Sequence, residues 1–369
     1  MSYTYKDAGV DIELGDDASK VLFEASKKTW ENRKGTFGEI INPFNDFSGV
    51  RVFDVSKLPE GSMMCLGFDG VGTKMEIAER MGKHDTIAYD LLAMVCDDAV
   101  VRGGEPVIVG SVLDVNSLGK DDESFIDFIK QLAIGYIGAA RDAGVAVING
   151  ELAELGARIT GYGPFNYNWG AGVIWIAKKD RMFTGKEINV GDKIVGLKEE
   201  GFRSNGLSLL RRVLVGEYGE DWHKDEKLAE GALTPSKIYS KAVCEMFGGY
   251  DKEPKALVTG VAHITGGGLP GKIGRILKPS SLGANITDPF DPCELMLQLQ
   301  KLGNIKDKEA YKTWNMGQGM AITTPEPEKI IKIAKAHNIE AKIIGEVVKD
   351  SGIKIRSKGA LSNSEELIF

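Results

Sequence analysis

Apolar and polar positions in the first half of the chain follow periods that predict strands alternating with helices. Residues 84–104 carry apolar side chains at the spacing of one helix face, and Gly103 and Gly104 supply a stop signal. Short apolar runs between turn residues, such as 62–66, are typical of buried strands. We therefore expect a layered fold with both helices and sheet. The expected strands cover 62–66, 106–115, 145–148 and 171–178, and the expected helices cover 16–33, 84–104 and 121–144.

The second half repeats this alternation after a polar stretch at 178–191, which we interpret as a linker. The repeated pattern predicts an α/β or α+β architecture with two domains, 1–180 and 181–369. The polar tail from 350 onward is expected to be mobile near its end. The expected strands are 193–197, 256–264, 320–324 and 341–347. One helix is expected to begin at about 207, and another to begin at 234–235 and end at 247. Further helices are expected at 292–301, 306–314 and 327–337.

Composition narrows the class of protein. The chain has 369 residues, enough for two domains that each bury a core, and a net charge of -7, which argues against nucleic acid as a partner. No apolar run approaches the roughly 18 residues that cross a membrane, and the N-terminus lacks the features of a signal peptide. We therefore predict a cytoplasmic protein without a membrane partner. The four scattered cysteines form no CxxC pair and are expected to be reduced core thiols.

The stretch DGVGTK at 69–74 follows the first predicted strand. Two glycines let the backbone approach a ligand closely, and Thr73 and Lys74 offer a hydroxyl and an ammonium suited to phosphate. Asp69 adds a carboxylate at the strand end. An acidic protein can bring carboxylates to a polyphosphate only with a divalent cation between them, so this combination indicates a metal-phosphate site. A polar β-turn is the plain alternative.

Further carboxylates occur at comparable places. Asp97 and Asp98 follow a strongly apolar turn of the 84–104 helix, where burial would make an uncompensated charge costly and a metal would compensate it. A solvated acidic helix face is the alternative. Glu151 follows the 145–148 strand beside a glycine and repeats the arrangement at Asp69.

Two glycine-containing loops precede helices in the second half. In GFRSNG, the residues Ser204, Asn205 and Gly206 can cap a helix or present backbone amides to an anion. The segment HITGGGLPGK at 263–272 fits the letters of two phosphate-binding motifs. However, Ile273 stands where a P-loop needs Ser or Thr, and the βαβ context with a ribose-binding acid that the dinucleotide motif needs is not established, so we reject both motif names. A helix start with exposed amides remains, with His263 beside it as a possible proton carrier or a structural residue.

Taken together, these segments resemble the aminoimidazole ribonucleotide synthetase family, also called phosphoribosylformylglycinamidine cyclo-ligase. The motifs YKDAGVDI, DGVGTK, HDTIAYDLLAM with its acidic pair, GGEP, SNG, HITGGGLP and YKTWNMGQGM occur in the family's order over residues 3–347. The resemblance implies an N-terminal domain that forms a β-barrel across a homodimer and a C-terminal mixed-sheet α/β domain. It also implies ATP- and Mg²⁺-dependent ring closure of formylglycinamidine ribonucleotide in purine biosynthesis.

The resemblance also implies roles for individual residues. His263 and Lys74 are the catalytic candidates, and the substrate is expected to be a nucleotide. The implied metal ligands are Asp69, Asp98 and Glu151; the implied ATP-side residues are Lys6, Asp7, Thr73, Lys74, Asp69 and Asp98; and the implied substrate residues are Ser204, Asn205, Gly206, His263, Thr265, Gly266, Gly267 and Gly268.

The chain departs from the family pattern in ways that leave alternatives open. Asp97 stands where the family usually has Asn, Asn149 where it has Gly, and Leu152 where it has Thr. A thiamine-monophosphate kinase and a non-catalytic nucleotide-binding protein therefore remain alternatives. A selenophosphate synthetase would need a reactive cysteine in an N-terminal loop, but the first cysteine here, Cys65, lies in a predicted strand. A hydrogenase maturase would need a C-terminal cysteine, but the chain ends Leu367-Ile368-Phe369.

Overall fold

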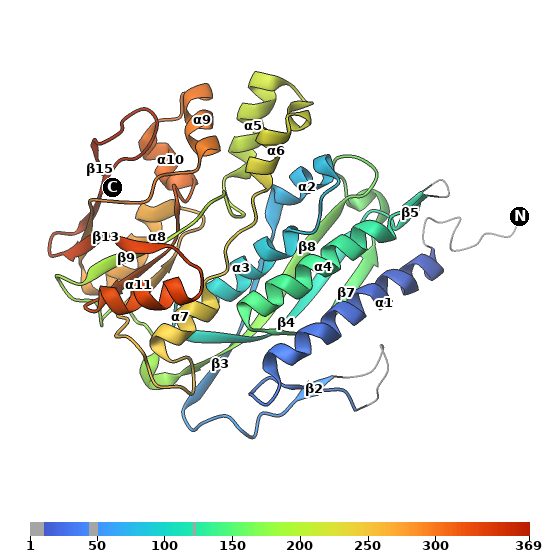
Figure 1. The fold of residues 1–369 in the computed structure, drawn as a ribbon, viewed down its shortest axis with the longest axis horizontal. Helices are drawn as coiled ribbons and strands as arrows, with labels where there is room; N and C mark the ends of the chain where they lie inside the picture. Colours follow the sequence, from blue (N-terminus) through green and yellow to red (C-terminus); the bar gives the residue numbers. More distant parts are fainter. Residues whose placement is uncertain (1–10, 44–50, 121–122) are drawn as a thin grey trace, which may run out of the picture. The chain divides into compact units, whose positions relative to one another are not determined.

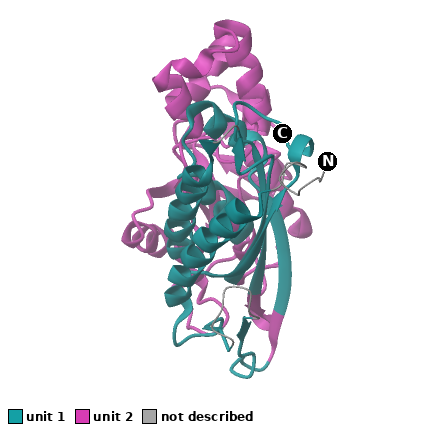
Figure 2. Ribbon diagram, turned by 90° about the vertical axis from the view of Figure 1, so that its right-hand side faces the viewer, with its two compact units in different colours: residues 1–60, 64–96, 106–175 teal, residues 61–63, 97–105, 176–369 magenta. Residues whose placement is uncertain are grey.

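The computed structural model describes residues 11–43, 51–120 and 123–369, which form two compact units (Figures 1 and 2). The first unit holds most of the chain up to residue 175. The second unit holds residues 61–63, 97–105 and 176–369. The units therefore interleave along the sequence, whereas the predicted division at residue 180 is a single cut in the chain and stays a prediction.

The first unit is built on a four-stranded sheet in the order β3-β8-β4-β7, in which β4 and β7 run parallel. Helices α1 and α4 pack against each other on one face of this sheet (Figure 1). The sheet does not close on itself within the described residues. Its main elements are α1 (Ile12–Thr29), β3 (Ser62–Gly70), α2 (Met75–Met81), α3 (Ile87–Val100), β4 (Gly104–Val115), α4 (Ile126–Ala143), β7 (Ala146–Glu154) and β8 (Tyr167–Lys178).

Helix α1 begins earlier than its sequence pattern predicts. The Asp11 carboxylate accepts hydrogen bonds from the backbone N–H groups of Glu13 and Leu14, and so caps the helix N-terminus. The expected start at residue 16 was therefore wrong. Lys27 and Lys28 occupy the last turn, where the helix dipole favours positive charge.

Strand β3 exists as predicted, but its burial was predicted wrongly. Met64, Leu66 and Phe68 expose 65%, 54% and 75% of their surface, and Cys65 is exposed as well. The reason is the place of β3 at the edge of the sheet, where one side has no neighbouring strand. Of the four cysteines, all free, only Cys96 is a fully buried core thiol.

The second unit contains a seven-stranded sheet in the order β10-β12-β9-β13-β11-β14-β15. All its strand pairs are antiparallel except β11 with β14. Its elements are β9 (Lys193–Lys198), α5 (Leu207–Tyr218), α6 (Glu226–Leu233), α7 (Ser240–Phe247), β10 (Gly260–His263), α8 (Gly268–Leu277), β11 (Gly283–Ile286), α9 (Glu294–Leu302), α10 (Asp307–Thr313), β12 (Gln318–Thr324), α11 (Pro327–Ala336), β13 (Ala341–Val348), β14 (Gly352–Arg356) and β15 (Glu366–Ile368).

The core of the second unit lies where α7 and α11 pack on the central strands. Val195 and Leu197 of β9 and Ile322 of β12 meet Met246 of α7 and Ile330 of α11 in one buried cluster. The tail, expected to be mobile, instead adds the strands β14 and β15 to the sheet. No described helix has the length and apolar character needed to cross a membrane.

Short elements complete the fold. They are the two-stranded ribbons β1 (Ile40–Ile41) with β2 (Val52–Phe53) and β5 (Gly119–Lys120) with β6 (Glu123–Ser124), and the 3₁₀ turns η2 (Trp30–Arg33), η3 (Gly72–Lys74), η4 (Gly156–Arg158), η5 (Lys179–Arg181), η6 (Trp222–Lys224) and η7 (Lys278–Ser280).

A buried histidine makes the stability of the first unit depend on pH. His84 packs among Phe128, Phe165 and Tyr167, and burial lowers its pKa from 6.5 to about 4. Because the unfolded chain binds this proton at higher pH, the stabilisation is complete above pH 6.5 and is lost as pH falls toward 4. We expect a loss of up to about 3 kcal/mol. Urea unfolding of wild type and His84→Phe between pH 7 and 4 measures it, and parallel stability curves would contradict it.

Candidate active site

Two loops that follow strands of the second unit come together. The loop 201–206 connects β9 to α5, and residues 264–267 connect β10 to α8. A Cβ atom placed on Gly266 would lie 3.8 Å from Asn205 Nδ2, so the loops are neighbours. The structure thus brings the predicted substrate segments Ser204–Gly206 and Thr265–Gly268 to one place in this unit.

Neither of the helices that start at these loops has a side-chain hydrogen bond capping its N-terminus. Gly206 caps α5 with φ 73° and Gly267 caps α8 with φ 93°, and neither helix has an acidic residue in its first turn. Gly268 must lack a side chain, because a Cβ atom there would collide with the carbonyl oxygen of Tyr311. Helix N-termini of this kind favour an anion. Pro270 lies two residues inside α8.

Two polar side-chain atoms of the first loop are left unsatisfied. The Ser204 hydroxyl and the Asn205 carbonyl oxygen are buried and have no hydrogen-bond partner among the described residues. Because a buried polar atom without a partner is costly, a bound polar molecule would stabilise both. Their position beside the α8 loop supports a ligand there.

Arg203 organises the base of this site. Its side chain is 1% exposed and donates hydrogen bonds to Glu199 Oε2 at 2.7 Å, the Lys237 carbonyl at 2.8 Å and Asp97 Oδ2 at 2.9 Å. Its Nη2 also lies 2.8 Å from His263 Nε2. Burial alone would lower the pKa of Arg203, but the two carboxylates raise it above the ordinary value. A permanently charged guanidinium therefore lies behind the histidine.

This contact fixes the tautomer of His263. A guanidinium can only donate, so His263 Nε2 must accept, and the ring proton is on Nδ1. Nδ1 lies 2.7 Å from Asp98 Oδ1 and therefore donates to that carboxylate. Burial raises the pKa of Asp98, but the hydrogen bond from His263 and the positive charges of Lys272 and Arg203 outweigh it, and the pKa falls below its usual value. In this arrangement both ring nitrogens of His263 are engaged.

The two neighbouring aspartates have different environments. Asp97 is fully buried and accepts from the backbone N–H groups of Tyr239 and Ser240 as well as from Arg203. Burial raises its pKa despite these partners. The Asp98 side chain is 58% exposed. The inference that a metal compensates this buried turn was therefore wrong for Asp97, because an arginine and two amides do so.

In the first unit, Asp69 and Glu151 line one cavity of about 800 Å³. Both side chains are exposed, and Asp69 Oδ1 accepts from the N–H of Gly70 at 2.7 Å. No three His, Cys, Asp or Glu side chains in the described ranges form a ready metal site. The carboxylates fit an ion that takes further ligands from phosphate, since magnesium uses one or two carboxylates plus phosphate oxygens. Thr73 is exposed nearby in sequence, and Lys6 and Asp7 lie outside the described residues.

Lys74 has an internal partner. Its side chain is fully buried, and Nζ lies 2.7 Å from Asp90 Oδ1, which is buried as well. A buried ion pair of this kind fixes α3 against the turn after β3. The role of Lys74 toward phosphate stays a prediction, and a double substitution separates it from the structural role.

We expect Lys74→Met to lower the free energy of unfolding by about 3 kcal/mol, because it removes the buried cation that is paired with the Asp90 carboxylate. Adding Asp90→Leu should recover most of that loss, since the charge is then removed too. Urea unfolding measures both. ATP affinity of the stable double variant then tests the phosphate role, and a double variant no more stable than Lys74→Met would contradict the pairing argument.

Sequence reasoning missed three members of the site. Arg203, Glu199 and Tyr239 are all at most 1% exposed, and Tyr239 Oη lies 3.1 Å from Glu199 Oε2. The available signal was weak: a charged residue inside the loop GFRSNG, between a buried strand and a helix start.

The geometry and the sequence together identify the class of protein. The family models for the N-terminal and C-terminal domains of AIR synthase related proteins match residues 51–173 and 189–358. E. coli HypE, a hydrogenase maturation protein, shares the fold with a TM-score of 0.61 at 14% identity, covering 94% of this chain and 95% of that one. The chain therefore has the two-domain AIR synthase-related fold.

Curated relatives narrow this class. Phosphoribosylformylglycinamidine cyclo-ligase of Oceanobacillus iheyensis is 33% identical over 359 residues, which cover 96% of this chain and 99% of that protein. The Bacillus cytotoxicus protein of the same name is 35% identical over 362 residues, covering 96% and 97%. The chain belongs to the phosphoribosylformylglycinamidine cyclo-ligase family, and the family resemblance in its motifs is confirmed.

Proposed function

We propose that this protein is an ATP-dependent cyclo-ligase that closes formylglycinamidine ribonucleotide to aminoimidazole ribonucleotide in purine biosynthesis. The observation that carries the proposal is the near-full-length identity to proteins of that name. The pairing of His263 with Asp98, beside two glycine-capped helix starts, supports it. A cyclo-ligase needs both features, namely a placed carboxylate and an anion site.

The chemistry has two steps. The formyl oxygen attacks the terminal phosphorus of ATP and ADP leaves; the internal nitrogen then attacks the activated carbon, the carbon–oxygen bond breaks, and phosphate departs with loss of a proton. Activation is needed because an unactivated amide oxygen is a poor leaving group. The protein's contribution is therefore positioning and charge stabilisation.

The substrate side of the site belongs to the second unit. The N–H groups at the starts of α5 and α8 would receive the substrate's own phosphate, and Ser204 and Asn205 would bond its polar groups. His263 would hold the Asp98 carboxylate through its Nδ1 proton while Arg203 fixes the ring. The predicted proton-carrying role of His263 remains part of the proposal.

On the ATP side, Asp69, Asp98 and Glu151 would hold Mg²⁺, which would neutralise phosphate charge. Asp69 and Glu151 line a common cavity, and the lowered pKa keeps Asp98 ionised. Lys6, Asp7, Thr73 and Lys74 remain the proposed ATP-side residues.

A homodimer is part of the proposal. Met64, Leu66 and Phe68 form an exposed apolar row on edge strand β3, a feature that usually marks an interaction surface. A second copy pairing there would complete the predicted β-barrel. Sedimentation tests this, and a monomer at micromolar concentration would contradict it. We also retain the cytoplasmic location, which the four free cysteines support.

The deciding experiment supplies ATP, Mg²⁺ and formylglycinamidine ribonucleotide and measures ADP release together with the imidazole product. Ring closure coupled one-to-one to ADP release is expected. Thiamine monophosphate serves as the comparison substrate and should release no ADP. ADP release with thiamine monophosphate alone, or nucleotide binding without turnover, would overturn the proposal in favour of a kinase or a non-catalytic protein.

A further inference from the structure

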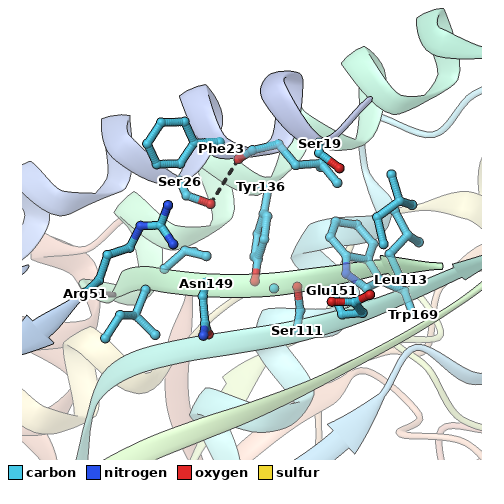
Figure 3. Close-up of a pocket in the computed structure, with 15 residues that line it drawn as sticks. Ser19, Phe23, Ser26, Arg51, Ser111, Leu113, Tyr136, Asn149, Glu151 and Trp169 are labelled. Carbon is cyan, nitrogen blue, oxygen red and sulfur yellow. Dashed lines mark hydrogen bonds between the residues drawn. The ribbon is translucent and has the colours of Figure 1, made fainter. Parts of the chain in front are cut away.

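A second cavity, of about 240 Å³, lies in the first unit between helices α1 and α4 and the strands beneath them (Figure 3), and it shares Ser111, Glu151 and Trp169 with the larger cavity that Asp69 lines. Phe23 of α1 and Tyr136 of α4 line it from the helix side. Ser111 of β4, Glu151 of β7 and Trp169 of β8 line it from the sheet. An engineered cavity of about 150 Å³ holds benzene, so this one has room for a fused pair of rings.

Two buried hydrogen-bonding groups in this cavity are not fully satisfied by the protein. The Tyr136 hydroxyl and the Trp169 indole nitrogen belong to side chains that are 3% and 1% exposed; the indole nitrogen makes no hydrogen bond within the described residues, and the hydroxyl faces only Ser111. Figure 3 shows the Tyr136 ring extending from α4 toward Ser111. Burial raises the pKa of Tyr136, an effect that Ser111 only partly offsets, so the phenol keeps its proton. Such groups are normally satisfied by protein, water or ligand.

The walls favour a flat, neutral occupant. Tyr136 and Trp169 meet edge to face with ring centroids 5.1 Å apart, and Phe23 adds a third ring. The guanidinium of Arg51 lies over Phe23, 4.7 Å from the ring centroid. The Glu151 carboxylate and the Arg51 guanidinium both belong to the lining and oppose each other's charge, so the cavity favours neither an anion nor a cation. The occupant must therefore accept hydrogen bonds from a phenol and an indole while stacking between aromatic side chains.

A purine base has this chemistry. Its ring nitrogens accept hydrogen bonds, its exocyclic group can bond the Ser111 hydroxyl, and its flat surface suits aromatic walls. The volume accommodates the base and not a whole triphosphate. We propose that the cavity lined by Tyr136, Trp169 and Ser111 is a purine-base site. The base can be that of ATP, in which case the inference rests on the proposed function, or that of a separate nucleoside.

The test titrates the full-length protein with adenosine and ATP, with cytidine for comparison, and follows binding by calorimetry and tryptophan emission. Tyr136→Phe removes only a hydroxyl and should weaken purine binding about 3- to 10-fold. Trp169→Phe should weaken it as well and abolish the emission change. Tyr89→Phe, in the same unit but outside the cavity lining, is the matched control and should bind like wild type.

Purine binding that both cavity variants leave unchanged would overturn the assignment. So would a crystal soaked with adenosine that shows ordered water only in the cavity. Displacement of adenosine by ATP would assign the base to ATP, and independent binding of both would assign it to a nucleoside. Ring closure is assayed in parallel. Activity without Tyr136-dependent purine binding contradicts only the cavity assignment, and Tyr136-dependent binding without ring closure contradicts only the proposed function.

Discussion

Arg203→Met should destabilise the protein by about 5 kcal/mol and remove its activity. The substitution strands two buried carboxylates, Glu199 and Asp97, and breaking even one buried pair costs about 3 to 5 kcal/mol. This is a large share of the roughly 5 to 15 kcal/mol that stabilises a typical domain. Activity should fail because Nε2 of His263 loses the donor that fixes its tautomer. Urea unfolding and the ring-closure assay measure the two effects.

Two further variants make this result interpretable. Arg212→Met, an exposed arginine on α5, should change the free energy of unfolding by less than about 0.5 kcal/mol. Arg203→Lys keeps the positive charge but cannot bridge Glu199, Asp97 and His263 at once. Its free energy of unfolding should therefore fall between that of wild type and that of Arg203→Met. A stable and active Arg203→Met variant would show that the buried network does not organise the site.

Much of the fold follows from local pattern. The helical spacing over 84–104 predicts α3, and the run before HITGGG predicts strand β10 followed by helix α8. Such segments carry their own start and stop signals, so they can be read without knowing their neighbours. The two glycine-containing helix starts were predicted on the same basis, because a glycine-rich helix start exposes amides wherever it lies in the fold, whereas their role toward the substrate was implied only by the family resemblance.

Features that depend on distant pairing could not be read in this way. The tail was expected to be mobile because it is polar, yet β14 pairs in parallel with β11 along four residues, beginning with Gly283 opposite Gly352. Strand β3 was expected to be buried because it is apolar, but burial depends on sheet order, which a local pattern does not contain.

The acidic pair shows the same limit at the scale of one residue. Asp97 and Asp98 are adjacent in sequence, but successive helix positions point about 100° apart. Asp97 therefore faces the interior and Arg203, while Asp98 faces outward beside His263. The apolar turn before them indicated burial correctly, but nothing local distinguished the structural carboxylate from the one available to a ligand.

Asp98→Asn should lower kcat/KM by about 10³-fold or more while leaving the fold intact. The asparagine carbonyl can still accept the Nδ1 proton of His263, so the geometry is kept and only the negative charge is lost. That charge is what the proposed Mg²⁺ requires, and the ion would in turn neutralise the transferred phosphoryl group; a loss of about 4 kcal/mol in transition-state stabilisation corresponds to this rate effect.

The half-exposed position of Asp98 keeps the stability cost of this change small, within about 1 kcal/mol by urea unfolding. Asp142→Asn, at an exposed site on α4, is the matched control and should retain full activity. If Asp98→Asn turned over at the wild-type rate, the carboxylate would not act in the reaction. The His263–Asp98 pair would then be a structural contact. Asp97 could not replace Asp98 as a ligand of Mg²⁺, because it already accepts hydrogen bonds from Arg203 and two backbone amides. Binding of Mg²⁺ would therefore rest on Asp69 and Glu151 alone.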